Sequence, residues 1–301
     1  MNIVKHRKIF YTISIIILGV CVASIFTFGL KMGVDFTGGS LLSVSFSDKL
    51  PAIGDVKEAL VNIGMKDASV RSAGTDAYII RTKEISQTEK GEVLQALSMD
   101  GQYSPQEKEF NTVGPVLGSE AINKSWISIV LVILAIVIFV TFVFRTVSRP
   151  VSSWVYGIVT ILSLVHDVIV PTGAFALFGY FYGFEVDTLF VTAILVVLGF
   201  SVHDTIVVFD RIRENLKKET DNNLSKNFEN IVGKSVSETI VRSINTSLTT
   251  LLAIAILYIF GPEATKHFSE TLLIGITAGV YSSIFIASPL LVTIHKWRLK
   301  E

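Results

Sequence analysis

Six long apolar stretches restrict the folds that this chain can adopt. A helix needs ~20 mostly apolar residues to cross the hydrocarbon core of a bilayer, and within lipid its backbone polar groups must bond to one another. Only 17% of the residues are charged, whereas soluble domains average about a quarter. The stretches cover residues 9–30, 126–144, 154–181, 188–209, 243–260 and 268–294. We therefore predict an α-helical polytopic membrane protein with six transmembrane helices.

Lysine and arginine residues predict how these helices are oriented, because short loops rich in them stay in the cytoplasm. The segment at 210–242 holds seven such residues, and both ends of the chain are basic. The link between the third and fourth stretches holds none. We expect both termini in the cytoplasm and residues 31–124 outside it. Apolar residues at helical spacing also predict that 210–242 forms an amphipathic helix on the inner membrane surface.

Residues 31–124 are the part of the chain that can form a water-soluble fold. Alternating apolar residues predict strands, and apolar residues at helical spacing predict helices. Strands are expected at 41–46, 68–73, 77–82 and 107–114, and helices at 53–64 and 86–97. This β-α-β-β-α-β order is typical of a ferredoxin-like domain. We therefore divide the chain into a first span (1–30), a small extracytoplasmic α+β domain (31–124) and five further spans (125–301).

The motifs of several chemistries are missing from the sequence. One cysteine, Cys21, allows no internal disulfide, and no Cys/His zinc pattern occurs. No GxxxxGK[ST] loop or nucleophile elbow is present. The net charge of zero favours no nucleic-acid partner. Residues 31–124 hold no histidine and only scattered acids, so a docking or substrate-contacting module is expected there. We predict a non-enzymatic protein without cofactor or metal.

Two nearly identical hexapeptides, VHDVIV at 165–170 and VHDTIV at 202–207, place ionisable residues in apolar stretches. An ionisable group at bilayer depth costs ~2.5–3.5 kcal/mol, so it normally faces a polar interior and has a partner. Neighbouring helical residues point about 100° apart, which argues against one metal ion held by both members of a pair. Two interpretations remain for His166, Asp167, His203 and Asp204: proton transfer, or hydrogen bonds that only hold helices together.

Polar residues also enter the fifth stretch along one side of a helix. Arg242, Asn245, Thr246 and Thr249 follow the spacing i, i+3, i+4 and i+7. We expect Arg242 to pair with Asp204 across this polar stripe. Two alternatives stay open, since a long arginine side chain can reach the membrane surface or can pair with Glu238 one turn earlier.

Small residues recur every four positions in the sixth stretch. They are Gly275, Gly279, Ser283 and Ala287. Small side chains at this spacing let helix backbones approach closely. This face is therefore expected to pack against another span or against a partner subunit.

Four segments carry a resemblance to a known family. They are GVDFTGGSLLSVSF (33–46), LVHDVIV (164–170), GFSVHDTIVVFDRIREN (199–215) and ETIVRSINTSLTTLL (238–252). The chain resembles the SecF family, which belongs to the RND-type transporter superfamily. This resemblance implies a protein-export subunit of the bacterial cytoplasmic membrane that works with SecD beside the SecYEG channel, using the proton motive force to promote export of preproteins. YajC and YidC are further candidate partners, besides protons and membrane lipids.

The resemblance also implies roles for individual residues. The family has a proton-linked aspartate at the position of Asp204 and a functional arginine at the position of Arg242. The position of His203 is often Asn in the family. Asp35, Gly38 and Gly39 match the family turn after the first span, where two glycines permit a tight path from helix to strand.

Two other functions remain as alternatives. One is an RND-type antiporter that exchanges small molecules for protons. The other is a non-transporting scaffold subunit that stabilises a channel. Six spans are half of the twelve that are usual for RND pumps, which argues against a self-sufficient antiporter. The missing half implies a partner chain, for which SecD is the natural candidate.

Overall fold

The computed structural model describes residues 3–47, 49–145, 150–219, 224–262 and 265–298, and it divides the chain into two compact units. The helical unit comprises Met1–Leu30, Ile127–Phe184 and Leu189–Glu301. The sheet unit comprises Lys31–Trp126 together with the four residues Glu185–Thr188.

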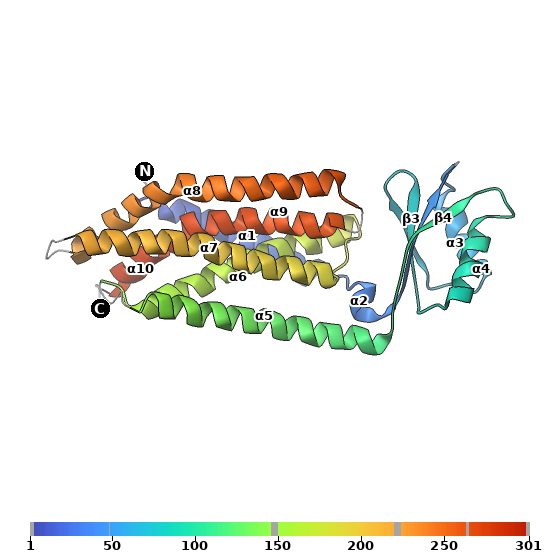
Figure 1. Cartoon of the computed structure of the whole chain (residues 1–301), viewed down its shortest axis with the longest axis horizontal. Helices are drawn as coiled ribbons and strands as arrows, with labels where there is room; N and C mark the ends of the chain where they lie inside the picture. Colours follow the sequence, from blue (N-terminus) through green and yellow to red (C-terminus); the bar gives the residue numbers. More distant parts are fainter. Residues whose placement is uncertain (1–2, 48, 146–149, 220–223, 263–264, 299–301) are drawn as a thin grey trace. The chain divides into compact units, whose positions relative to one another are not determined.

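Long helices make up the helical unit (Figure 1). They are α1 (Arg7–Phe28), α5 (Pro115–Val143), α6 (Ser153–Phe181), α7 (Thr188–Lys218), α8 (Leu224–Phe260), α9 (Lys266–Ser282) and α10 (Ser288–Arg298). A short π-helical segment, Ser283–Ala287, joins α9 to α10. With α9 to α10 counted as one rod, the described residues contain six helices that are long and apolar enough to cross a membrane. The prediction of a multi-pass membrane protein is therefore confirmed.

The amphipathic segment differs from the prediction. Helix α7 continues to Lys218, and α8 begins at Leu224 and runs without a break to Phe260. Most apolar residues near the start of α8, among them Phe228, Val232 and Val236, are buried against the bundle, whereas Val241 is exposed. Residues 224–242 are thus the first turns of the fifth spanning helix and not a separate surface helix.

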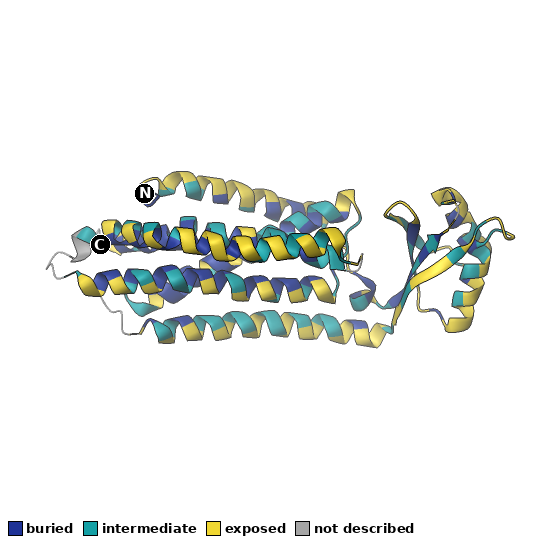
Figure 2. Ribbon diagram, turned by 45° about the horizontal axis from the view of Figure 1, so that its top comes forward, coloured by how far each residue is buried: buried dark blue, intermediate teal, exposed yellow. Residues whose placement is uncertain are grey.

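Burial sorts the helices into central and peripheral ones (Figure 2). In the most apolar window of each span, 61% of the α9–α10 rod and 50% of α7 are buried, against 6% of α5 and 11% of α8. The exposed residues of α5 and of the second half of α8 are mainly apolar, as expected for side chains that face lipid. Helices α6, α7 and α9 form the centre of this unit.

A seam of small residues brings α7 and α9 together. A Cβ atom at Gly275 would lie 2.9 Å from Val197 Cγ1, and one at Gly279 would lie 3.0 Å from Ser201 Cβ. Ala287, further along the same rod, is fully buried. The predicted small-residue face therefore lies against another span of the same chain.

The sheet unit is a four-stranded antiparallel sheet with two helices. Its elements are β1 (Gly39–Phe46), α3 (Ile53–Asn62), β2 (Ser69–Ala73), β3 (Ala77–Thr82), α4 (Gln87–Leu97) and β4 (Pro105–Val113), in the sheet order β2-β3-β1-β4. Its core includes Val44, Val56, Leu60, Ile80 and Val93. The predicted order of strands and helices is observed, and Ser86 and Glu89 form a capping box at the start of α4.

Two glycines connect the short helix α2 (Val34–Thr37) to β1. Gly38 and Gly39 have φ angles of +72° and +121°, which disfavour other residues. A Cβ atom would also lie 2.9 Å from Pro115 Cα at Gly38 and 2.5 Å from the Thr82 carbonyl oxygen at Gly39. Both the backbone conformation and the close approach therefore require glycine.

Residues Glu185–Thr188, between α6 and α7, belong to the sheet unit through a dense set of bonds. The Glu185 carboxylate pairs with Arg71 at 2.9 Å and with Arg81 at 2.6 Å. The Val186 carbonyl accepts a bond from Gly33 N at 2.7 Å, and Val186 N donates to the Lys31 carbonyl at 2.7 Å. The sequence patterns do not indicate any of these contacts.

Asp35 completes this set of bonds. Its Oδ2 accepts hydrogen bonds from Thr188 N at 3.0 Å and from Thr188 Oγ1 at 2.6 Å. Thr188 is the first residue of α7. Asp35 therefore satisfies a backbone N–H at the start of this helix, which has no partner within the helix itself.

We expect Gly275→Leu to lower the free energy of unfolding by about 1–3 kcal/mol, because the side chain would overlap Val197 and force α7 and α9 apart. Thermal unfolding in detergent measures this effect. Gly199→Leu on α7 is the matched control, since a Cβ atom there meets nothing within 4 Å. Equal stabilities of the two variants would show that the seam does not constrain the bundle.

We expect Asp35→Ala to lower the free energy of unfolding by about 1–2 kcal/mol, because it removes the carboxylate that accepts a hydrogen bond from Thr188 N. The loss is measured by thermal unfolding and by protease sensitivity of residues 185–188. Asp67→Ala is the control, since Asp67 forms an exposed ion pair with Lys83, and such pairs contribute about 0–1 kcal/mol. A smaller loss for Asp35→Ala than for Asp67→Ala would contradict the proposed role of the bond.

Candidate functional site

A fully buried carboxylate, Asp167 on α6, lies at the centre of a polar cluster in the helical unit. Its Oδ2 accepts hydrogen bonds from Ser201 Oγ on α7 and, at 2.8 Å, from Ser282 Oγ on α9. Its Oδ1 lies 2.9 Å from Nδ1 of His166. Donors from separate helices thus converge on one side chain.

More hydroxyl groups extend this cluster. Ser163 Oγ donates to Ser282 Oγ at 2.9 Å. Ser283 Oγ donates to the Ser201 carbonyl at 3.3 Å and lies 2.8 Å from Thr205 Oγ1. The π-helical segment begins at Ser283, and the hydroxyl of Ser288 bonds to the Ser283 carbonyl at 3.0 Å. Such segments are frequent at functional sites.

Sequence reasoning missed these hydroxyl residues. Ser163 and Ser282 match no sequence motif, and Ser201 was not singled out within the family segment at 199–215. Two signals were available: Ser201 stands three positions before Asp204, and Ser283 belongs to the small-residue series of the sixth stretch. Buried serines on spanning helices normally bond across to a neighbouring helix.

His166 is buried beside Asp167, with 3% of its surface exposed. Its ring stacks on that of Tyr281 with centroids 6.1 Å apart. Among the described residues, its Nε2 has no hydrogen-bond partner although it is buried. A buried nitrogen without a hydrogen-bond partner is energetically costly, so His166 is a candidate for a functional role in this cluster.

Asp204 on α7 is also buried, with 3% exposed, but its surroundings are simpler. Its Oδ2 accepts one hydrogen bond, at 3.0 Å, from Ser247 Oγ on α8. The two acidic residues thus bond to different helices. Asp167 bonds to α7 and α9, and Asp204 bonds to α8.

The polar stripe of α8 does not face Asp204. Arg242, Asn245, Thr246 and Thr249 are exposed, whereas Ser243 and Ser247 are buried. Five positions along a helix correspond to a rotation of about 140°, so a helix that turns Ser247 toward Asp204 turns Arg242 away. Within the described part of the chain no ion pair joins Arg242 to Asp204, and the expected pairing is not formed.

His203 likewise points away from the buried cluster and is exposed. The two similar hexapeptides therefore have different environments. In the first, both His166 and Asp167 are buried, and in the second only Asp204 is. The described residues contain no group of three or more His, Cys, Asp or Glu side chains that could hold a metal ion.

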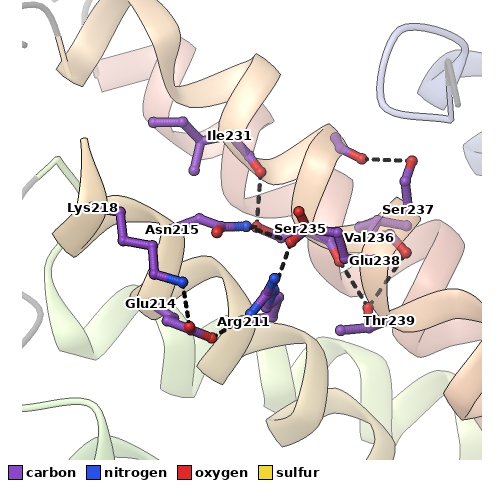
Figure 3. Close-up of polar contacts among 11 residues, drawn as sticks. Arg211, Glu214, Asn215, Lys218, Ile231, Ser235, Val236, Ser237, Glu238 and Thr239 are labelled. Atoms are coloured by element: carbon purple, nitrogen blue, oxygen red, sulfur yellow. Dashed lines mark hydrogen bonds and ion pairs between the residues drawn. The ribbon is translucent and has the colours of Figure 1, made fainter.

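A second polar network ties α7 to α8 nearer the end of the bundle (Figure 3). Glu238 accepts from Arg211 Nε at 2.6 Å and from Asn215 Nδ2 at 2.9 Å. Asn215 also donates to Ser235 Oγ at 2.9 Å. Glu238 therefore has Arg211 as its ionic partner, and no described ion pair joins it to Arg242.

Comparisons with known proteins agree with this architecture. The family described as "Protein export membrane protein SecD/SecF, C-terminal" matches residues 93–297, and the "SecD/SecF GG Motif" matches residues 23–49, which include Gly38 and Gly39. The protein translocase subunit SecF of Thermobaculum terrenum is 43% identical, with 100% of this chain and 95% of the relative aligned. The SecF of Anaerolinea thermophila is 38% identical, with 97% of this chain and 93% of the relative aligned.

A solved structure is similar as well. The crystal structure of SecDF from Thermus thermophilus, described as a translocon-associated membrane protein, superposes with a TM-score of 0.84 at 25% identity. The superposition covers 99% of this chain and 39% of the SecDF chain, so the present chain spans about two fifths of that protein. The family matches and the full-length relatives show that this chain belongs to the SecF family of protein translocase subunits.

Proposed function

We propose that this SecF chain promotes the export of preproteins by binding and releasing protons at Asp167 and Asp204. The main observation behind this proposal is the set of hydrogen bonds around Asp167. An ionised carboxylate only accepts hydrogen bonds, and the hydroxyls of Ser201 and Ser282 both donate to one of its oxygens. A protonated carboxylic acid must itself donate one bond. A proton on Oδ2 therefore requires at least one serine to reorient, which alters the contact between α6 and its neighbours, whereas a proton on Oδ1 is donated to Nδ1 of His166 and changes the His166–Asp167 pair instead.

Asp204 supplies a second site with a different structural consequence. Its contact is with Ser247 of α8, so a change of charge there affects the contact of α7 with α8. Thr205, which follows Asp204, lies beside the Ser283 hydroxyl, and Ser283 bonds to Ser201, a partner of Asp167. Hydroxyl groups thus connect the surroundings of the two acids. A proton moving down the membrane potential supplies about 2.3 kcal/mol per 100 mV.

SecD is the partner that we propose for the exposed face of α8. Arg242 and its polar neighbours lie on a helix that is long and apolar enough to span a membrane, and they are exposed in the isolated chain. Ionisable side chains in spanning helices normally face protein or water rather than lipid. A partner that covers this stripe would place Arg242 in a functional interface without any contact to Asp204 inside this chain.

The rest of the assembly follows from the same proposal. Both termini lie in the cytoplasm and the sheet unit lies outside it, in agreement with the positions of lysine and arginine. The sheet unit is a ferredoxin-like domain, supported by its β-α-β-β-α-β order and its sheet order β2-β3-β1-β4. SecYEG is the channel that this complex serves, with YajC and YidC as further partners.

We expect the variants Asp204→Asn and Asp167→Asn to insert into the membrane and to assemble with SecD. They should lose the part of export that depends on the proton gradient, because an amide side chain does not bind and release a proton near neutral pH. Export kinetics in membrane vesicles at fixed ATP and varied gradient measure this loss. Asp67→Asn in the sheet unit is the matched control, since Asp67 is exposed. His203→Asn should keep its activity, because His203 points away from the buried cluster.

Gradient-dependent export at the wild-type rate in both Asp204→Asn and Asp167→Asn would end the proton-transfer proposal. It would leave the scaffold function as the better account of this chain.

We also expect a cysteine at Thr249 to cross-link to SecD, because Thr249 lies on the exposed polar stripe of α8. The background variant is Cys21→Ser, which removes the native cysteine. A cysteine at Ile138, on the exposed apolar side of α5, is the control that should not cross-link. Equal cross-linking from both positions would show that the stripe is not the SecD interface.

A further inference from the structure

A small pocket lies between the segment that precedes α1 and the first turns of α8. Its volume is about 210 Å³, and its polar lining includes Lys5, Glu229, Asn230 and Lys234. Val4 closes one side, since its side chain lies 3.9 Å from the position of a Cβ atom on Gly233. All of these residues belong to the helical unit.

The pocket has an excess of positive charge. Its acidic residue, Glu229, is already neutralised, because Arg7 pairs with it at 2.8 Å and Lys296 pairs with it as well. By contrast, no ion pair among the described residues joins Lys5 or Lys234 to a carboxylate; Glu238, one turn from Lys234, attracts it at longer range but forms its own ion pair with Arg211. Two ammonium groups therefore face a cavity whose acidic group is bonded to other cations.

The pocket lies where the surface of the bundle changes from polar to apolar. The exposed apolar side of α1 begins at Ile9, four residues after Lys5, and that of α8 begins at Val241, seven residues after Lys234. The start of α1 and the end of α10 are at this end of the bundle (Figure 1). Trp297 on α10 is 64% exposed close to Lys296, which binds Glu229. Exposed tryptophans are typical of the interface between lipid and water.

We propose that this pocket binds the phosphate group of an anionic phospholipid. Lys5 and Lys234 balance the phosphate charge, the amide of Asn230 donates a hydrogen bond, and the acyl chains follow the apolar sides that start at Ile9 and Val241. The cavity is smaller than the ~300–1,000 Å³ sites that enclose whole ligands, which suits a headgroup whose chains remain in the bilayer. Basic pockets between membrane helices bind phospholipid headgroups in this way. The bound lipid fastens the N-terminal segment to α8.

The test is native mass spectrometry of the full chain in detergent, titrated with phosphatidylglycerol or with phosphatidylcholine of the same acyl chains. We expect phosphatidylglycerol to bind the wild type more tightly. Each lysine near anionic lipid contributes a factor of about five, so the double variant Lys5→Gln/Lys234→Gln should lose roughly 25-fold in affinity for phosphatidylglycerol. Its weak binding of phosphatidylcholine should not change.

The matched control is Lys8→Gln/Lys217→Gln, which removes the same charge from two lysines that do not line the pocket. This control should keep nearly all of the affinity for phosphatidylglycerol. Equal losses in the two double variants would overturn the proposal, because they would show diffuse attraction to the basic surface. The last measurement is a competition with inorganic phosphate. If phosphate at equal concentration displaced phosphatidylglycerol, the pocket would be a site for free phosphate and the proposal of a lipid ligand would be overturned.

Discussion

The burial of Asp167 is the constraint on which the centre of the helical unit depends. A buried ionised group costs several kcal/mol unless nearby donors compensate for the lost water. Here the compensation comes from hydroxyls on α7 and α9, so these helices must lie close to α6 and to each other. Gly279 makes this possible, since a Cβ atom there would crowd Ser201, the serine that bonds to Asp167. The glycine seam and the polar cluster are parts of one arrangement.

The second acid extends this arrangement toward a less buried helix. Asp204 bonds to Ser247 of α8, and only 11% of the apolar window of α8 is buried in the isolated chain. Under the proposed function, a proton at Asp167 changes contacts in the centre of the unit, whereas a proton at Asp204 changes contacts of the helix that carries the exposed polar stripe. Under this proposal, Asp167 acts on the central helices of the unit, and Asp204 acts on α8, the helix that faces the partner.

Helix α6 carries Asp167 and helix α7 carries Asp204. The residues that join these two helices belong to the sheet unit. Glu185 is bonded to Arg71 and Arg81, Val186 to the backbone of Gly33 and Lys31, and Thr188 to Asp35. This explains why the segment after the first span contains an aspartate as well as its two glycines. The glycines allow the chain to turn into β1, and Asp35 binds the start of α7.

The sequence by itself determined the spanning helices, the order of elements in the sheet unit and the family, because these depend on the length, period and identity of local segments. It also located both acids and the glycines of the seam. Only the tertiary structure decided which way each side chain faces. VHDVIV and VHDTIV differ at one position, yet His166 is buried and His203 is exposed. On α8, the stripe that looked functional faces outward, and Ser247 takes the place at Asp204 that Arg242 was expected to occupy. The physical reason is that the spacing of residues along a helix predicts only which residues lie on the same side. Which side faces inward depends on packing against the neighbouring helices.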